Sequence, residues 1–479
     1  MRNLTYNLRE VCEAGPPILI HLWLASCVRG VIATVWRRDH CELMIITKIL
    51  LLCRFVFIGF ILAIGVTQSV AQVLEVGAAK RVITPDPLLP VSGGVGQPKK
   101  STIKKGDLFV RSIVLKSSGT VIAIVSVDNL GWSSALGDRS RVLIKNIPKE
   151  NILISATHTH SAPDAYGFPD ESGKSLADLK YLDWCAQQIA DAVNEASAKA
   201  EPSVLKIAVG EAEGKIAYNY YADKLYDPRC GIIQAIGESG ANKGKVLATL
   251  VNYAVHPEVI GSGQGILSPD LCGPLYDRIE SKVGGVALFI NGAQGGMVTA
   301  DTRLENGKEA NTWEECIRIG NLLADEALRI VESADVQRTP KLLCASRTIE
   351  FPVESEMMQY ILNNSPIKMP MASADRVSTR LNYLQIGTAK VLTIPGEALP
   401  NIGFYIKRKM NTPHAFLFGL TNDAFGYILT KVDFNSFKRY DYVSRTSLGE
   451  MTGEIYIEEV LRWLAELSST KQPLLKSDN

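Results

Sequence analysis

The chain has no excess of charge of either sign. Its 51 Lys and Arg residues are balanced by 50 Asp and Glu residues, which leaves a formal net charge of +1 at pH 7. Proteins that bind nucleic acids usually carry a clear basic excess, so the composition argues against a nucleic-acid partner. Low-complexity linkers and internal repeats are also absent from residues 73–470, which we therefore interpret as a single domain.

Closely spaced cysteines are missing as well. Four of the nine cysteines precede residue 72, and no two of the remaining five form a CxxC pair. A zinc site built from thiolates is therefore disfavoured. The odd number of these cysteines gives no indication of a disulfide framework. We expect buried free thiols, with at most one disulfide, among Cys185, Cys230, Cys272, Cys316 and Cys344.

The first 72 residues differ from the rest of the chain. An apolar run after Met44 carries two basic residues, Lys48 and Arg54, in its first part. It is uncharged over 55–66 and ends in small residues, a layout typical of a secretory signal. The uncharged part is shorter than the ~20 residues that a membrane-spanning helix needs. We predict an exported protein, either periplasmic, extracellular or anchored in the envelope. Within this leader (1–72), we expect residues 1–43 to be a misassigned start. We expect residues 44–71 to be a signal peptide or a membrane anchor.

After the leader, strand-like and helix-like segments alternate. Buried strands are predicted from short apolar runs at 121–127, 151–156, 245–255, 286–290 and 391–394. Helices are predicted from helical spacing over 181–200, 313–332 and 453–467. In the first of these helices, Trp184 is expected on the buried face. The alternation predicts an α/β fold with mixed β-sheets packed against helices over 73–470, followed by a disordered tail over 471–479.

Two histidines directly follow one of the predicted strands. His158 and His160 are two residues apart in the segment ATHTHSAP, and alternate residues of an extended chain face the same way. The two imidazoles can therefore face one cavity, where they could bind a metal ion. A hydrogen-bonded surface histidine is the alternative for either residue, and the spacing alone leaves both interpretations open.

Three further polar residues stand near the ends of strand-like segments, namely His256, Glu397 and Tyr427. Imidazole and carboxylate groups are zinc ligands, although each residue taken singly is more often structural: a satisfied histidine, an exposed glutamate or a packed aromatic ring. The scarcity of histidine favours the metal interpretation. Only four histidines follow the leader, and three of them lie at strand-to-loop junctions. The fourth, His414, lies in a turn and is interpreted as structural.

Taken together, these segments resemble the neutral, non-lysosomal ceramidase family. The likeness extends from about residue 75 to about residue 467 and covers that family's catalytic domain. It is carried, in the family's order, by GAAKRVITP from Gly77, ATHTHSAP from Ala156, NYAVHP from Asn252, the glycine-rich turn after Ile290, PGE from Pro395 and LTNDAFGY from Leu420.

The resemblance implies a single Zn²⁺ ion and hydrolysis of the amide bond of ceramide. The metal ligands that it implies are His158, His256, Glu397 and Tyr427. His160 is implied as a catalytic residue that contacts the substrate or moves a proton. Thr299 occupies the position of a family serine after the glycine-rich turn. The resemblance therefore implies that Thr299 belongs to the catalytic site. A lipid substrate also implies association with a membrane surface.

Departures from the family concern recognition of the substrate. Thr299 replaces the serine, and no arginine follows Asn219, where the family has a site arginine. The sequence ends where the family's β-sandwich begins, so we expect the catalytic domain without a C-terminal β-sandwich. The pattern therefore predicts intact metal chemistry with altered recognition of the lipid.

Three functions are compatible with these residues. The leading one is a zinc-dependent hydrolase that cleaves an N-acyl amide bond. The second keeps the zinc but cleaves an extracellular ester, because the same chemistry attacks esters more easily. The third is a lipid- or glycan-binding module of the envelope without catalysis. Retention of the four implied ligands favours catalysis, and the sequence leaves the oligomeric state open.

Overall fold

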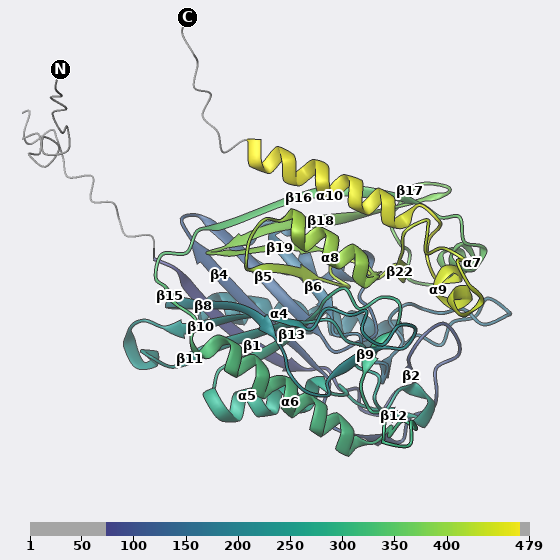
Figure 1. Cartoon of the computed structure of the whole chain (residues 1–479), viewed down its shortest axis with the longest axis horizontal. Helices are drawn as coiled ribbons and strands as arrows, with labels where there is room; N and C mark the ends of the chain where they lie inside the picture. The colour runs from purple at the N-terminus through teal and green to yellow at the C-terminus, as the bar shows by residue number, and fades with distance from the viewer. Residues whose placement is uncertain (1–72, 470–479) are drawn as a thin grey trace, which may run out of the picture. The chain divides into compact units, whose positions relative to one another are not determined.

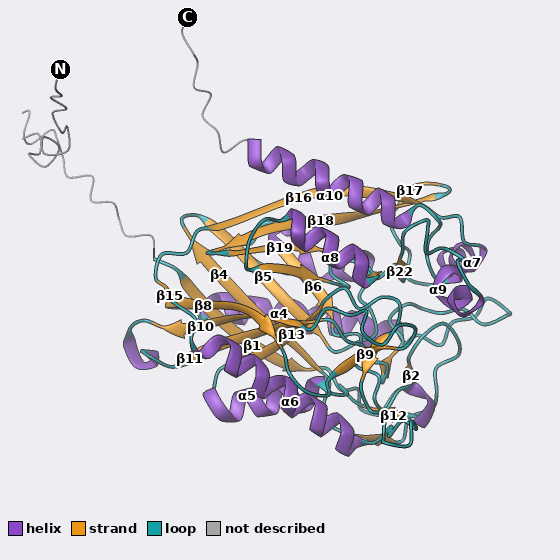
Figure 2. Ribbon diagram, in the orientation of Figure 1, coloured by secondary structure: helices purple, strands orange, loops and turns teal. Residues whose placement is uncertain are grey.

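Two β-sheets form the centre of the fold, and helices lie on their outer faces (Figure 1). The computed structural model describes residues 73–469, so the predicted leader and the predicted tail at 471–479 lie outside the described residues. The described residues belong to one compact unit. Figure 2 shows the mixture of helices and open sheets, and the predicted α/β class with mixed sheets is confirmed.

The larger sheet has nine strands, and its parallel pairs lie at its two edges. Its spatial order is β13 (Val286–Asn291), β11 (Val246–Tyr253), β10 (Arg229–Gly237), β8 (Glu201–Glu211), β1 (Glu75–Val82), β4 (Phe109–Ser117), β5 (Thr120–Val127) and β6 (Ile152–Ala156), with β15 (Val336–Gln337) paired to β8. Strands β11 and β13 run parallel, as do β5 and β6, and the other neighbours run antiparallel. The candidate histidines follow β6 and β11.

This sheet is bent, so that its two edges approach each other. The hydroxyl of Ser126 in β5 donates to the carbonyl oxygen of Phe289 at 2.6 Å, and Arg111 in β4 donates to the carbonyl oxygen of Ala287 at 3.1 Å. Both carbonyls belong to the edge strand β13. Buried backbone groups of an edge strand need partners, and these two side chains supply them. The bend therefore places the end of β13 near the end of β6.

The smaller sheet packs on the inner faces of both halves of the larger one. It consists of β16 (Leu342–Pro352), β17 (Met371–Ser373), β18 (Arg376–Ile386), β19 (Ala389–Thr393) and β21 (Ala415–Phe418). The core follows the two-residue period of a strand. In β5, Ile122 and Ile124 face the core shared with Phe416 of the smaller sheet, whereas Val125 and Val127 face the helices outside.

The helices cover the outer faces. The larger sheet is covered by α3 (Ser134–Arg141), α4 (Leu179–Ala198), α5 (Cys272–Val283) and α6 (Trp313–Glu332), and α8 (Pro400–Lys409) and α10 (Thr452–Ser469) cover the smaller one. The predicted helices and strands are present, but the placement of Trp184 is wrong. Its side chain is 41% exposed. It lies five residues before the buried Ile189, roughly 140° around a helix that turns about 100° per residue.

The five cysteines of the described residues are all free, and only Cys344 is not fully buried. Burial raises the pKa of the Cys185 and Cys230 thiols to about 12, which keeps them protonated and unreactive. Within residues 73–469, none of the helices has both the length and the apolar character needed to cross a membrane.

The substitution Gly231→Ala tests how closely the two sheets pack. A Cβ atom at residue 231 would lie 2.5 Å from Cε1 of Phe416, a fully buried ring. Because overpacking of this kind costs about 1–3 kcal/mol, we expect the free energy of unfolding in a denaturant titration to fall by that amount. Gly263→Ala is the control, since no atom lies within 4 Å of its added Cβ. Equal losses in both variants would contradict the close packing.

Candidate metal centre

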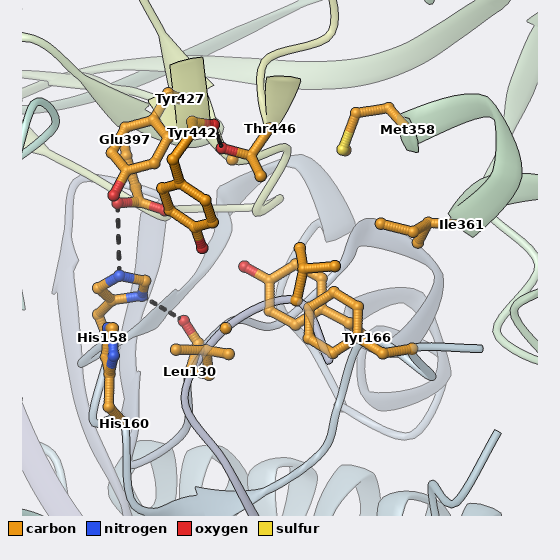
Figure 3. A pocket seen from close by; sticks show the side chains of 14 residues that line it. Leu130, His158, His160, Tyr166, Met358, Ile361, Glu397, Tyr427, Tyr442 and Thr446 are labelled. Carbon is orange, nitrogen blue, oxygen red and sulfur yellow. Dashed lines mark hydrogen bonds and ion pairs between the residues drawn. The ribbon is translucent and has the colours of Figure 1, made fainter. Parts of the chain in front are cut away.

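His158 lies two residues beyond β6 in a backbone conformation that non-glycine residues rarely adopt. Its φ is +73°, and residues held in the left-handed region often occur at functional sites. Ring atom Nδ1 lies 2.6 Å from the carbonyl oxygen of Leu130. A carbonyl can only accept a hydrogen bond, so Nδ1 carries the proton. The Nε2 lone pair remains available, 3.4 Å from Oε2 of Glu397 (Figure 3).

His256 repeats this arrangement from another strand. It lies three residues beyond the end of β11 and is fully buried. Its backbone N–H donates to the carbonyl oxygen of Val298 at 2.8 Å, and its Nδ1 lies 2.9 Å from the same oxygen. Its Nε2 lies 3.1 Å from Oε2 of Glu397. Hydrogen bonds of this kind fix the tautomer and orientation of metal-binding histidines.

Glu397 and Tyr427 lie side by side as register partners of two short parallel strands, β20 (Glu397–Ala398) and β22 (Tyr427–Ile428). The Glu397 side chain is almost completely buried. The Tyr427 hydroxyl donates to the sulfur of Met297 at 3.1 Å. Burial raises the pKa of Tyr427 well above its usual range, so the side chain is a neutral phenol here. The strand pairing places this phenol beside the carboxylate on which the two histidines converge.

His160 completes a group of three neighbouring imidazoles. Its ring centroid lies 4.7 Å from that of His158 and 5.6 Å from that of His256. Its Nδ1 is 3.4 Å from Oε2 of Glu258, whereas its Nε2 is buried and has no hydrogen-bond partner. The available nitrogens of the three histidines lie within 4.8 Å of one another, so the group could hold a metal ion.

The charges at this point call for a cation. Two Nε2 lone pairs and a carboxylate oxygen face one another, and such acceptors repel unless a positive charge lies between them. Burial lowers the pKa of His256, but the Glu397 carboxylate outweighs this effect and raises that pKa to about 9. Burial raises the pKa of Glu397, yet His158 and His256 outweigh it and hold that pKa well below its usual range. The donor set therefore fits a metal ion that prefers nitrogen and oxygen ligands.

Asn291, the last residue of β13, ties the two histidine segments together. Its Nδ2 donates to the carbonyl oxygens of Thr157 at 3.2 Å and of Val255 at 2.7 Å. Its Oδ1 accepts from the backbone N–H of Val255 at 3.2 Å. Thr157 and Val255 immediately precede His158 and His256, so one fully buried amide sets the distance between the two candidate ligands.

The centre borders a small, largely apolar cavity with a volume of about 60 Å³. Figure 3 shows His158 and Glu397 at one end and Met358 and Ile361 at the other. The hydroxyl of Tyr442 faces this space. Burial raises the pKa of Tyr442 to about 12, so the hydroxyl stays protonated and can donate. The cavity therefore has an apolar end, which suits an alkyl group, and a polar end at the histidine and carboxylate centre.

The structure brings five of the six predicted site residues together and places the sixth beside them. The five are His158, His160, His256, Glu397 and Tyr427. Thr299 belongs to β14 (Val298–Ala300) and forms a backbone bridge with His256, but it lines a separate cavity. Sequence reasoning missed Asn291, Glu258 and Tyr442. Glu258 alone had a recognisable signal, as a carboxylate two residues after a candidate ligand.

Fold and site together define an α/β protein with a buried histidine and carboxylate centre. Two solved structures share this fold: the neutral ceramidase from Pseudomonas aeruginosa and a ceramidase complexed with C2. Each aligns with a TM-score of 0.68 and 17% sequence identity over 83% of this chain, and over 75% and 76% of their own chains. No protein-family model and no curated protein sequence matches the chain. The resemblance to neutral ceramidases is thus confirmed as a likeness of fold.

Asn291→Ala tests whether this amide sets the geometry of the centre. The change leaves buried backbone groups without partners, at about 1–3 kcal/mol each. We expect lower stability and a metal affinity lower by about 10–100-fold, the usual cost of losing a group that orients the ligands, in calorimetric Zn²⁺ titrations. The control is Asn194→Ala, because Asn194 also bridges backbone groups but does so on α4. Unchanged Zn²⁺ affinity in a folded Asn291 variant would contradict the role.

Proposed function

We propose that this chain is a zinc-dependent hydrolase that cleaves the amide bond of an N-acyl lipid of the ceramide type. The observation that carries the proposal is the convergence of His158 and His256 on Oε2 of Glu397, with both Nδ1 atoms held by carbonyl oxygens. Neutral imidazoles and a carboxylate are the ligands of hydrolytic zinc sites. Tyr427, opposite Glu397 on β22, is the fourth proposed ligand.

A zinc ion held by these residues would polarise the amide carbonyl and lower the pKa of a water molecule to about 7. Proton transfer is assigned to His160. Burial, together with the neighbouring histidines, holds the pKa of His160 well below its usual range, so the imidazole is neutral at rest. Its buried Nε2 has no other partner, and this free nitrogen is the atom assigned to move a proton to the leaving amine.

The apolar cavity supports an acyl chain as part of the substrate. Leu130, Phe168, Met358 and Ile361 line it away from the centre. The protonated hydroxyl of Tyr442 faces the same space in Figure 3 and is placed to donate to the oxygen that gains negative charge as the amide reacts. Thr299 is left without a proposed catalytic role, because it lines the other cavity.

The place of action is also a proposal. Because lipid amides reside in membranes, we propose that the domain acts outside the cytoplasm and associates with a membrane surface. The apolar character of the leader supports this placement.

Metal content provides the direct test of the centre. We expect purified protein to bind about one zinc ion per chain, as such sites do, and His158→Ala, His256→Ala and Glu397→Gln to lose most of it in elemental analysis. His414→Ala is the matched control, since His414 bonds Thr388 at 2.8 Å and lies outside the centre. Circular dichroism checks folding. Full zinc content in a folded His158→Ala variant would exclude His158 as a ligand.

The bond that is cleaved can be determined with matched substrates. We expect the zinc-loaded protein to hydrolyse an N-acyl amide of the ceramide type and to lose this turnover on chelation, because the polarised carbonyl requires the ion. The ester with the same acyl chain serves as the comparison. Cleavage of the ester alone would assign an esterase. Binding of the amide without turnover of either compound would assign a lipid-binding protein.

A further inference from the structure

A second cavity lies beside the histidine group, and one of its lining residues, Glu258, contacts His160. It has a volume of about 260 Å³. Polar groups dominate its wall: Tyr220, Glu258, Thr299, Thr302, Glu309 and Asn311. Neither lysine nor arginine is among its lining residues.

Two side-chain pairs separate this polar cavity from the apolar one. His160 lines the apolar cavity, and its Nδ1 lies 3.4 Å from Oε2 of Glu258, which lines the polar cavity. Tyr427 lines the apolar cavity, and its hydroxyl donates at 3.1 Å to the sulfur of Met297, which lines the polar one. The cavities have no lining residue in common. The metal centre is therefore the partition between them.

The backbone of this partition is held in an unusual conformation. Met297 has a φ of +61°, in the left-handed region that side chains with a Cβ atom rarely adopt. Conformations of this kind persist where the surrounding structure enforces them, and they cluster at functional sites. Methionine is also the most adaptable apolar side chain. The Met297 side chain is therefore the most adaptable part of the partition.

We propose that the polar cavity binds the amine side of the substrate and selects a positively charged, hydrophilic amine. This inference rests on the proposed hydrolysis of an N-acyl amide and narrows the substrate to amides with a hydrophilic amine in place of the sphingoid base of ceramide. An amide held at the centre carries one substituent on its carbonyl carbon and one on its nitrogen, and each cavity receives one of them. The apolar cavity takes the acyl chain, because its far end offers no polar partner for a charged group. The carboxylates of Glu258 and Glu309 attract a cation.

Glu309 is the residue that recognises the positive charge of the amine. Glu258 also contacts His160, so its substitution would disturb the centre itself. The exposed Glu309 side chain accepts a hydrogen bond from the Tyr218 hydroxyl at 2.7 Å and makes no hydrogen bond or ion pair with the histidines of the centre. A glutamine at this position keeps an acceptor for Tyr218 while removing the negative charge, so Glu309→Gln separates charge recognition from the integrity of the centre.

The test uses three dodecanoyl amides that differ only in the amine: 1,5-diaminopentane, 5-aminopentanol and 6-aminohexanoate. We expect kcat/KM to be highest for the cationic amide. In Glu309→Gln, kcat/KM for that amide should fall about tenfold, the equivalent of one hydrogen bond to a charged group, while the neutral amide changes by less than about twofold. Glu305→Gln is the matched control, an exposed glutamate of the same loop outside the cavity lining.

A binding measurement gives a second readout that does not depend on turnover. We expect 1,5-diaminopentane to bind the protein in calorimetry and to bind Glu309→Gln about tenfold more weakly. N-dodecanoylsphingosine, the ceramide with the same acyl chain, serves as a fourth substrate. A higher kcat/KM for this ceramide than for the cationic amide, or equal effects of Glu309→Gln on the three other amides, would overturn this inference and leave amide hydrolysis standing. Failure of the zinc-loaded protein to cleave any amide, ceramide included, would overturn both.

Discussion

The convergence of two imidazole nitrogens and one carboxylate oxygen on a single point is the constraint on which the rest of the structure depends. Each imidazole has its Nδ1 proton committed to a carbonyl oxygen, so the lone pairs of His158 and His256 must face Oε2 of Glu397. Such an arrangement needs a positive charge. Without a metal ion a second proton on His256 supplies it, because Glu397 and Glu258 raise the pKa of His256 to about 9 in spite of burial. A cation between these groups removes the repulsion.

The fold maintains this convergence by bending the larger sheet. Its parallel edge pairs carry the two histidine segments, and along the sheet they are separated by β10, β8, β1 and β4. The bend closes that gap, and buried polar side chains hold it in place: Ser126 and Arg111 satisfy carbonyls of β13, and Asn291 binds the backbone before each histidine. Buried hydrogen bonds are costly to leave unmade, so the same contacts that complete the sheet also determine the geometry of the site.

The centre lies between two unlike cavities, so the two ends of a proposed substrate would meet different surroundings. One wall is apolar and suits an alkyl chain, and the other is polar and acidic. A likeness of fold at 17% identity does not carry a substrate with it. The linings of the cavities, rather than the fold, therefore bear on the substrate of the proposed hydrolase, and the polar wall differs from what the alkyl tail of a sphingoid base requires.

Local pattern in the sequence determined the elements, and the resemblance to the ceramidase family supplied the set of candidate ligands. The strand before His158, the helix at 313–332 and the strand-end placement of His256 all follow from hydrophobic periodicity, which acts over a few residues. Tertiary structure alone decided that Asn291 joins the histidine segments, that Trp184 faces solvent and that Thr299 lines the second cavity. These outcomes depend on the bend of the sheet and on contacts between residues far apart in the chain. No local pattern encodes the distance between two strand ends.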